Sequence, residues 1–120
     1  MKKIIAASIG NCVHIAGIIN FLSLADREGY DTRFLGAAIS IDELMDSVKQ
    51  ERPDFVGVSY RLTPEPLKEV LKELKKKISN LGLTNIKWIF GGTEPTAKVA
   101  EESGIFSMVF DGMEDADVVI

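Results

Sequence analysis

Cysteine and histidine are scarce in this chain of 120 residues, and basic residues are fewer than acidic ones. Its 14 lysines and arginines are outnumbered by 18 aspartates and glutamates, which gives a formal net charge of −4. Nucleic acids require a clustered positive surface on their protein partners, so this charge argues against a nucleic-acid partner. The single cysteine excludes an intrachain disulfide, and this fits a reducing compartment.

An uninterrupted hydrophobic run long enough for a membrane anchor is also lacking. No Asp, Glu, Lys or Arg lies between Ile4 and Ala25, and two lysines precede this stretch as they would in a signal peptide. However, polar residues interrupt the stretch, and the pair Gly10-Asn11 is typical of a turn. A buried parallel strand followed by a helix gives the same apolar density. We therefore expect no membrane segment and a cytoplasmic protein.

Five short apolar stretches alternate with segments of helical periodicity. The strands are expected at residues 3–9, 31–36, 54–59, 86–90 and 107–110. Helices are expected at residues 13–28 and at about 95–103, and two more are expected to begin at about residues 40 and 63. This alternation predicts an α/β fold with a doubly wound, five-stranded parallel sheet between helical layers. The leading strand order is the flavodoxin-like one, 2-1-3-4-5.

Several helix boundaries have clear signals. Ser40 and Glu43 have the spacing of a capping box, and Thr63 precedes a proline at the first helical position. Gly104 is expected to end the fourth helix. The lysines at residues 75–77 fall late in the third helix, where they suit the negative end of its dipole, and we interpret them as solvated rather than phosphate-binding.

The length of the chain corresponds to one domain, residues 1–120. Residues 113–120 begin what should be a fifth helix, but the sequence stops after barely two turns. We therefore expect this chain to be the front part of a longer protein.

In a flavodoxin-like sheet, ligands bind at the carboxyl ends of the central strands. Three loops should converge there, at residues 10–17, 59–63 and 91–93. The first loop contains the only histidine of the chain, His14, next to Cys12. The third loop begins with a double glycine, Gly91-Gly92.

Three functions of this fold fit the loops poorly. A phosphoacceptor receiver domain needs acidic residues where this chain has Ser8, Asn11 and Ser59. A flavin-phosphate loop would be rich in serine and threonine after the first strand. A nucleophilic pair of Cys12 and His14 is conceivable, but a spacing of two residues is unfavourable and no third orienting group is evident.

The three loops resemble one family more closely. The sequence Cys12-Val13-His14-Ile15-Ala16-Gly17 is followed by Ser59-Tyr60-Arg61 and then by Gly91-Gly92. These elements and their spacing are similar to the Asp-x-His-x-x-Gly, Ser-x-Leu and Gly-Gly motifs of the B12-binding domains of methionine synthase, methylmalonyl-CoA mutase and glutamate mutase. The resemblance covers essentially the whole chain.

The resemblance implies a cobalamin cofactor, as adenosylcobalamin or methylcobalamin. In this family the dimethylbenzimidazole base leaves cobalt, and the nucleotide tail enters a pocket between the sheet and the first helix. The resemblance gives His14 the lower axial position on cobalt. It implies that Ser59 hydrogen-bonds the buried base, that Gly91 and Gly92 admit the tail, and that Gly17 lets the first helix lie against it. The implied cofactor-binding residues are Asn11, Cys12, Val13, His14, Ile15, Gly17, Ser59, Arg61, Thr63, Gly91, Gly92, Thr93 and Gly112.

Two residues depart from the family pattern. Cys12 replaces the aspartate that orients the histidine, and a thiol is a weaker acceptor, so His14 is expected to be a softer ligand unless Asn11 substitutes. Arg61 replaces a leucine, and it either reaches the nucleotide phosphate or points to solvent. With no catalytic residues expected on this chain, the resemblance implies a module that presents the corrinoid to a mutase or methyltransferase domain or subunit. The alternatives are a non-catalytic interaction domain and a corrinoid sensor.

Overall fold

Five parallel strands form one sheet in the order β2-β1-β3-β4-β5, which confirms the expected flavodoxin-like topology. The structure is a computed structural model that describes residues 2–10, 16–82 and 85–110. The strands are β1 (Lys3–Ile9), β2 (Asp31–Ile39), β3 (Phe55–Tyr60), β4 (Lys87–Gly92) and β5 (Met108–Phe110). The helices are α1 (Ala16–Arg27), α2 (Ile41–Glu51), α3 (Pro64–Leu81) and α4 (Glu94–Ser103).

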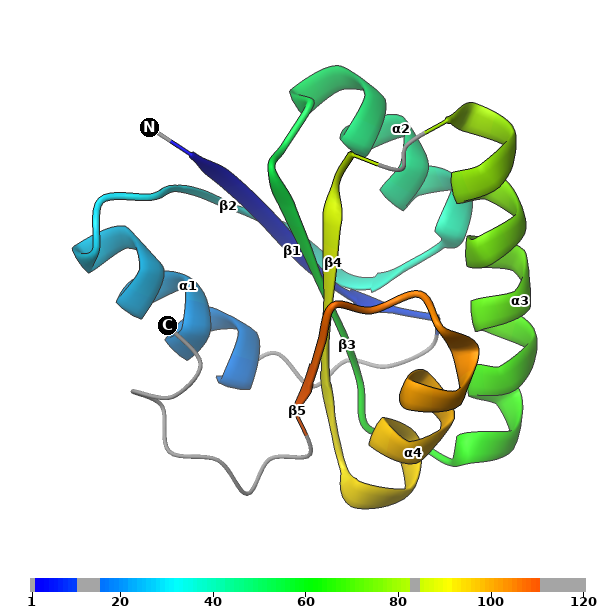
Figure 1. The fold of residues 1–120 in the computed structure, drawn as a ribbon. Helices are drawn as coiled ribbons and strands as arrows, with labels where there is room; N and C mark the ends of the chain where they lie inside the picture. Colours follow the sequence, from blue (N-terminus) through cyan, green and yellow to red (C-terminus); the bar gives the residue numbers. More distant parts are fainter. Residues whose placement is uncertain (1, 11–15, 83–84, 111–120) are drawn as a thin grey trace.

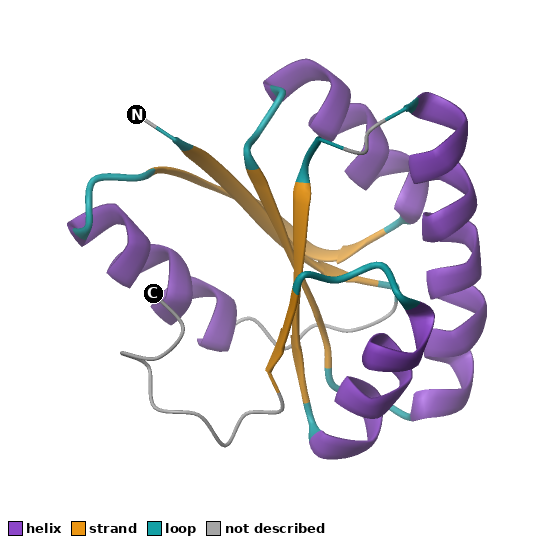
Figure 2. Cartoon of the chain, in the orientation of Figure 1, coloured by secondary structure: helices purple, strands orange, loops and turns teal. Residues whose placement is uncertain are grey.

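The described helices are divided unequally between the two faces of the sheet. Figure 1 shows α2, α3 and α4 on one side, and α1 on the other. Figure 2 shows the same three layers by secondary structure, with the strands running between the two sets of helices. We call the side covered by α2, α3 and α4 the packed face, and the side covered by α1 the α1 face.

Large side chains fill the packed face. Successive residues of a strand point to opposite faces, so Ile5, Ala7 and Ile9 of β1 lie on this side, together with Phe90 of β4. They meet the apolar stripes of the helices, including Leu67, Leu71 and Leu74 of α3 and Leu44, Met45 and Val48 of α2. Trp88, the only tryptophan, belongs to the same cluster and is 3% exposed.

The core of the α1 face is smaller. It consists of Ile4 and Ala6 from β1 with Ile18, Leu22 and Ala25 from α1, and four partly buried aromatic residues pack against it. In the described part of the chain, no helix combines the length and the apolarity needed to cross a bilayer.

The expected signals at the helix ends are only partly reproduced. Ser40 Oγ accepts a hydrogen bond from the Glu43 backbone N–H (3.1 Å), and Glu43 Oε1 accepts one from the Ser40 N–H (3.4 Å), so the capping box is confirmed. Thr63 occupies the N-cap of α3, but its side chain makes no capping hydrogen bond. Gly104 is left-handed (φ 74°) and ends α4 as expected.

The second strand is longer than the sequence analysis predicted. Gly36 was expected to end it, whereas β2 continues to Ile39. The register with β1 shifts twice over this stretch, where Gly36 (φ 130°) and Ala38 (φ 53°) both have positive φ. Irregularities of this kind bend a strand without ending it, so the glycine marks a bulge rather than the end of the strand.

Strand β1 matches its predicted bounds, and most of the other described boundaries differ by one or two residues. Strands β3 and β4 both extend one or two residues further than expected, to Tyr60 and Gly92. Helix α1 spans Ala16–Arg27. The first three residues of the expected helix, 13–15, and the expected fifth helix at 113–120 lie outside the described residues.

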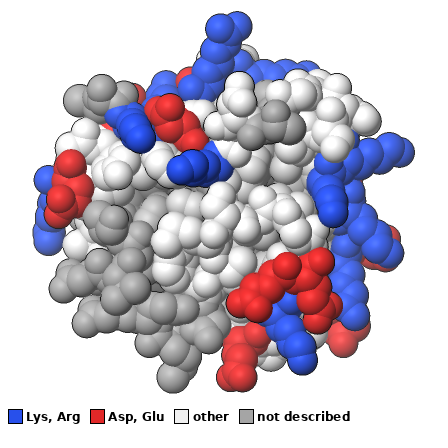
Figure 3. Space-filling view, viewed as in Figure 1, with Lys and Arg blue, Asp and Glu red and all other residues white. Residues whose placement is uncertain are grey.

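The lysines of α3 lie on the surface, as predicted. Figure 3 shows basic side chains gathered along the side of the molecule formed by α3. Lys75 Nζ donates to the Ser103 carbonyl oxygen at the end of α4 (3.0 Å), and Lys77 Nζ lies 2.7 Å from Asp42 Oδ1. These contacts tie α3 to its neighbouring helices.

Candidate functional site

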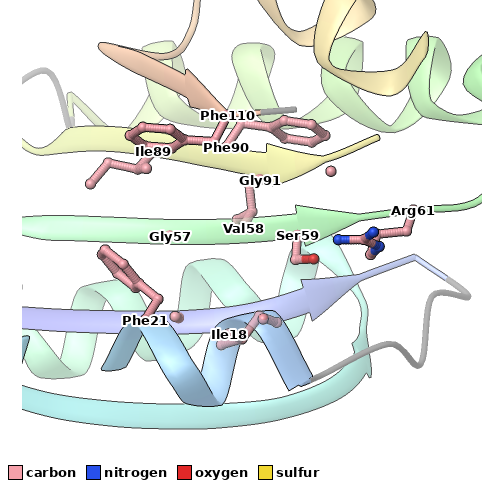
Figure 4. A pocket seen from close by; sticks show the side chains of 13 residues that line it. Ile18, Phe21, Gly57, Val58, Ser59, Arg61, Ile89, Phe90, Gly91 and Phe110 are labelled. Carbon is pink, nitrogen blue, oxygen red and sulfur yellow. The ribbon is translucent and has the colours of Figure 1, made fainter. Parts of the chain in front are cut away.

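A cavity of about 170 Å³ lies between α1 and the α1 face of the sheet. We call this cavity the slot. Figure 4 shows the side chains around it, which come from α1 on one side and from β1, β3, β4 and β5 on the other. The lining residues are Ala6, Gly17, Ile18, Phe21, Gly57, Val58, Ser59, Arg61, Ile89, Phe90, Gly91, Gly92 and Phe110.

The sheet contributes two rows of residues to the floor of the slot. The inner row is Ala6, Gly57 and Ile89, which are partners in register across β1, β3 and β4. The outer row, two residues closer to the carboxyl ends, contains Ser59 and Gly91, followed by Phe110 of β5. Ser8 is the register partner of Ser59 on β1 and is fully buried.

Small side chains leave the space that the slot occupies. A Cβ atom added at Gly57 would lie 3.4 Å from Ala6 Cβ and 3.9 Å from Phe21 Cε2, so the Phe21 ring closes the inner part of the floor. A Cβ atom added at Gly91 or at Gly17 would meet nothing within 4 Å. A flat group can therefore approach the backbone of the sheet at this point.

Polar groups lie toward the mouth of the slot. Ser59, which is 8% exposed, supplies a hydroxyl group in the outer row. Arg61 is exposed and follows at the carboxyl end of β3, where Figure 4 shows its guanidinium group near Ser59. From the mouth inward, the slot thus presents a cation, then a hydroxyl group, then carbon.

The two glycines of the double glycine have different surroundings. A Cβ atom added at Gly92 would lie 2.4 Å from Thr96 Oγ1 and 2.5 Å from the Tyr60 carbonyl oxygen. Packing between β3, β4 and α4 therefore requires glycine at Gly92 whether or not a ligand is bound. Gly91 has no such constraint, and the space beside it is open to the slot.

The two threonines among the expected site residues also differ. The Thr93 N–H donates to Thr96 Oγ1 (2.9 Å), and the hydroxyl groups of Thr93 and Thr96 are 3.1 Å apart. The Thr96 side chain thus accepts a hydrogen bond from the backbone N–H of Thr93 at the start of α4. Thr63 is exposed at the start of α3 and does not line the slot.

The first loop is described only at its ends. The Gly10 N–H donates to the Ile39 carbonyl oxygen (3.1 Å), which fixes the start of the loop to the end of β2. The loop rejoins the described chain at α1, whose Gly17 lines the slot. The expected site residues Asn11, Cys12, Val13, His14, Ile15 and Gly112 lie outside the described residues.

The sequence analysis missed most of the apolar lining, because apolar residues in strands and helices are usually core. Ala6, Gly57, Ile89, Ile18 and Phe21 all belong to this group. Strand alternation contains a usable signal: once Ser59 is assigned to a ligand, Gly57 must share its face.

The one ion-pair network described at the sheet lies at the opposite, amino-terminal edge. Glu51 accepts a hydrogen bond from Lys3 Nζ (2.6 Å) and also pairs with Arg33. The hydrogen bond from Lys3 is the main cause that lowers the pKa of the Glu51 carboxyl group below its usual value. This network ties α2 to β1 and β2 and is remote from the slot.

Comparisons with known proteins give one family match and several proteins of similar fold. A family model described as a B12 binding domain matches residues 2–120. A cobalamin-binding protein from Desulfitobacterium hafniense superposes with a TM-score of 0.82 at 26% identity, over 98% of this chain and 55% of its own. The methanol:cobalamin methyltransferase complex from Methanosarcina barkeri gives 0.81 at 18% identity, over 98% and 43%.

The fold is also shared with a second group of proteins. A LuxR-family response regulator from Staphylococcus aureus gives a TM-score of 0.61 at 19% identity, over 99% of this chain and 93% of its own. The chain spans about half the length of the two cobalamin proteins that it matches.

Proposed function

Because this chain belongs to the B12 binding domain family, we propose that it holds cobalamin with the lower base off cobalt and the nucleotide tail in the slot. The order of groups along the slot supports this proposal. A cation at the mouth, a hydroxyl group behind it and carbon at the inner end suit a tail of phosphate, ribose and flat aromatic base.

The residues of the slot fit such a tail. In this arrangement the base lies over Gly91, where the absent side chain lets a flat ring approach the sheet, and beside the Phe21 ring that covers Gly57. Ser59 hydrogen-bonds the ring nitrogen that has left cobalt, and Arg61 faces the phosphate with an opposite charge. Gly17 lets the first turn of α1 lie against the tail.

In the proposal, His14 takes the lower axial position on cobalt. His14 lies three residues before Gly17, which lines the slot, so the chain length allows the imidazole to reach its mouth. Imidazole is a common metal ligand whose second nitrogen usually needs a partner. Cys12 offers a weaker acceptor than the aspartate of the family, so we expect a softer ligand.

Cobalamin supplies the chemistry when it is bound, through its cobalt–carbon bond, and the protein supplies binding and orientation. With its tail held in the slot, the corrinoid ring would lie over the carboxyl edge of the sheet, with its upper face open to a second domain or subunit. We propose that this face meets the catalytic domain or subunit of a B12-dependent mutase or methyltransferase. One similar protein is part of a methanol:cobalamin methyltransferase complex, which agrees with a partner of this kind.

The test is to mix the purified chain with hydroxocobalamin, remove unbound cofactor by desalting, and record the visible spectrum. We expect retained corrinoid, and an EPR spectrum of the Co(II) form whose axial-nitrogen splitting changes when histidine is labelled with ¹⁵N. His14 is the only histidine, so this change reports one residue.

Two variants separate binding from ligation. His14→Ala is expected to retain corrinoid but to lose the isotope-sensitive splitting, whereas Cys12→Asp is expected to keep the splitting and hold the histidine more firmly. If the wild-type chain retains no corrinoid, the proposal is wrong. If it retains corrinoid with no effect of ¹⁵N-histidine, His14 is not the ligand.

A further inference from the structure

We infer that the slot selects corrinoids by the polarity of their lower base, favouring a benzimidazole over a purine. This inference rests on the proposed function, because it requires the tail to enter the slot. Natural corrinoids differ in this base: some end in dimethylbenzimidazole and others in adenine. The two bicyclic rings are similar in size, so a choice between them depends on polar groups.

The inner end of the slot has only carbon to offer from its side chains. Its floor is Ala6, Gly57 and Ile89, and its wall on α1 is Ile18 and Phe21. Gly57 lies on a central strand that is paired on both sides, so its backbone N–H and C=O groups are committed to the sheet. A polar atom brought here finds no partner.

The polar groups of the slot lie too close to its mouth to hydrogen-bond a polar atom at the inner end. Ser59 is two residues closer to the mouth than Gly57, a rise of roughly 6.6 Å along a strand, and Arg61 lies further still. The ribose is attached to the five-membered ring of either base, so the six-membered ring enters first. In dimethylbenzimidazole this ring carries two methyl groups, whereas in adenine it carries ring nitrogens and an amino group.

Burying those polar atoms without partners costs free energy, while burying methyl groups gains it. A single unpaired hydrogen-bonding group corresponds to a difference in Kd of about tenfold to a hundredfold. We therefore expect the chain to bind the benzimidazole corrinoid more tightly than the adenine corrinoid by at least this factor.

The experiment is to measure the Kd of the whole chain for hydroxocobalamin, for its adenine-base analogue, and for cobinamide, which lacks the base and its nucleotide. The expected order of affinity is hydroxocobalamin, then the adenine analogue, then cobinamide. Equal affinity for the two bases would overturn this inference and leave the proposed function standing. No binding of any corrinoid, or equal binding of cobinamide and cobalamin, would overturn the proposed tail-in-slot function itself.

A matched pair of variants tests the cause. Ile89→Thr places a hydroxyl group in the inner row and shortens the side chain by one carbon atom, and it should reduce the preference for benzimidazole severalfold. Val109→Thr introduces the same hydroxyl group on β5, where the side chain packs against the packed-face core, and it should leave the preference unchanged. An unaltered preference in both variants would show that the inner row does not determine the choice between benzimidazole and adenine.

Discussion

The two faces of the sheet differ in what fills them. On the packed face, β4 contributes Trp88 and Phe90, and three helices cover them. On the α1 face, the same strand contributes Ile89 and Gly91, and the space beside Gly91 is open. Trp88 and Phe90 of this strand thus pack into the core, while Ile89 and Gly91 face the slot, so neighbouring residues should respond to substitution in different ways.

The largest difference between the faces should come from two phenylalanines. Phe90 is fully buried on the packed face, and Phe90→Ala should reduce the free energy of unfolding by about 3–5 kcal/mol because it leaves a cavity. Phe21 is half-buried beside the slot, and Phe21→Ala should cost only about 1–2 kcal/mol. Urea unfolding of the cofactor-free chain measures both values. Equal losses of stability in the two variants would contradict the view that the packed face contributes more to stability than the α1 face.

The double glycine provides the next test. Gly92→Ala places a Cβ atom 2.5 Å from a backbone carbonyl oxygen, so we expect a loss of about 1–3 kcal/mol in stability. Gly91→Ala places it in open space and should change stability by less than about 0.5 kcal/mol. Cobalamin affinity should fall in Gly91→Ala. A stable Gly91→Ala variant with undiminished affinity would show that Gly91 is not part of the binding site.

Helix caps should show a smaller contrast. Ser40 caps α2 on the packed face through a reciprocal pair of hydrogen bonds, and Ser40→Ala should cost about 1 kcal/mol. Thr63 makes no side-chain capping bond, so Thr63→Ala should reduce the stability by only about a few tenths of 1 kcal/mol. Thermal unfolding compares the two. If Thr63→Ala leaves the Tm unchanged but weakens cobalamin binding, its hydroxyl group belongs to the site.

The smallest effect should come from Glu51, which ties the end of α2 to β1 and β2. Its lowered pKa stabilises the fold at a pH above its usual value of 4.5, and this contribution is lost as the pH falls through the lower folded-state pKa. Glu51→Gln should therefore be less stable than the wild type near neutral pH and match it in acid. Glu28→Gln, which makes the same substitution at an exposed glutamate after α1, is the matched control. Unfolding in urea at the two pH values measures the difference.

Hydrophobic periodicity and caps were sufficient to predict the fold. The strand order, the capping box at Ser40 and the left-handed end of α4 all agree with the structure. Ala38 and Arg52 were not anticipated, because positive φ at residues other than glycine depends on tertiary contacts that local sequence does not encode.

The expected site residues that line the slot are a serine, an arginine and three glycines: Ser59, Arg61, Gly17, Gly91 and Gly92. The apolar lining was not predictable, because Ile18 or Ile89 has the same pattern whether it faces a core or a cavity. The sequence also did not show that a side chain would clash at Gly92 but not at Gly91, because the clash depends on the position of Thr96 in the folded structure.

Trp88 provides a natural fluorescence probe on the packed face. It is the only tryptophan, and its Nε1 is buried without a hydrogen-bond partner in the described part of the chain. Its fluorescence should therefore be blue-shifted in the folded chain and move to longer wavelength on unfolding. Corrinoids absorb where indole emits, so a corrinoid held on the far side of the sheet would quench this fluorescence by energy transfer without touching the ring. Emission wavelength then reports folding, and emission intensity reports loading, from one side chain in one sample.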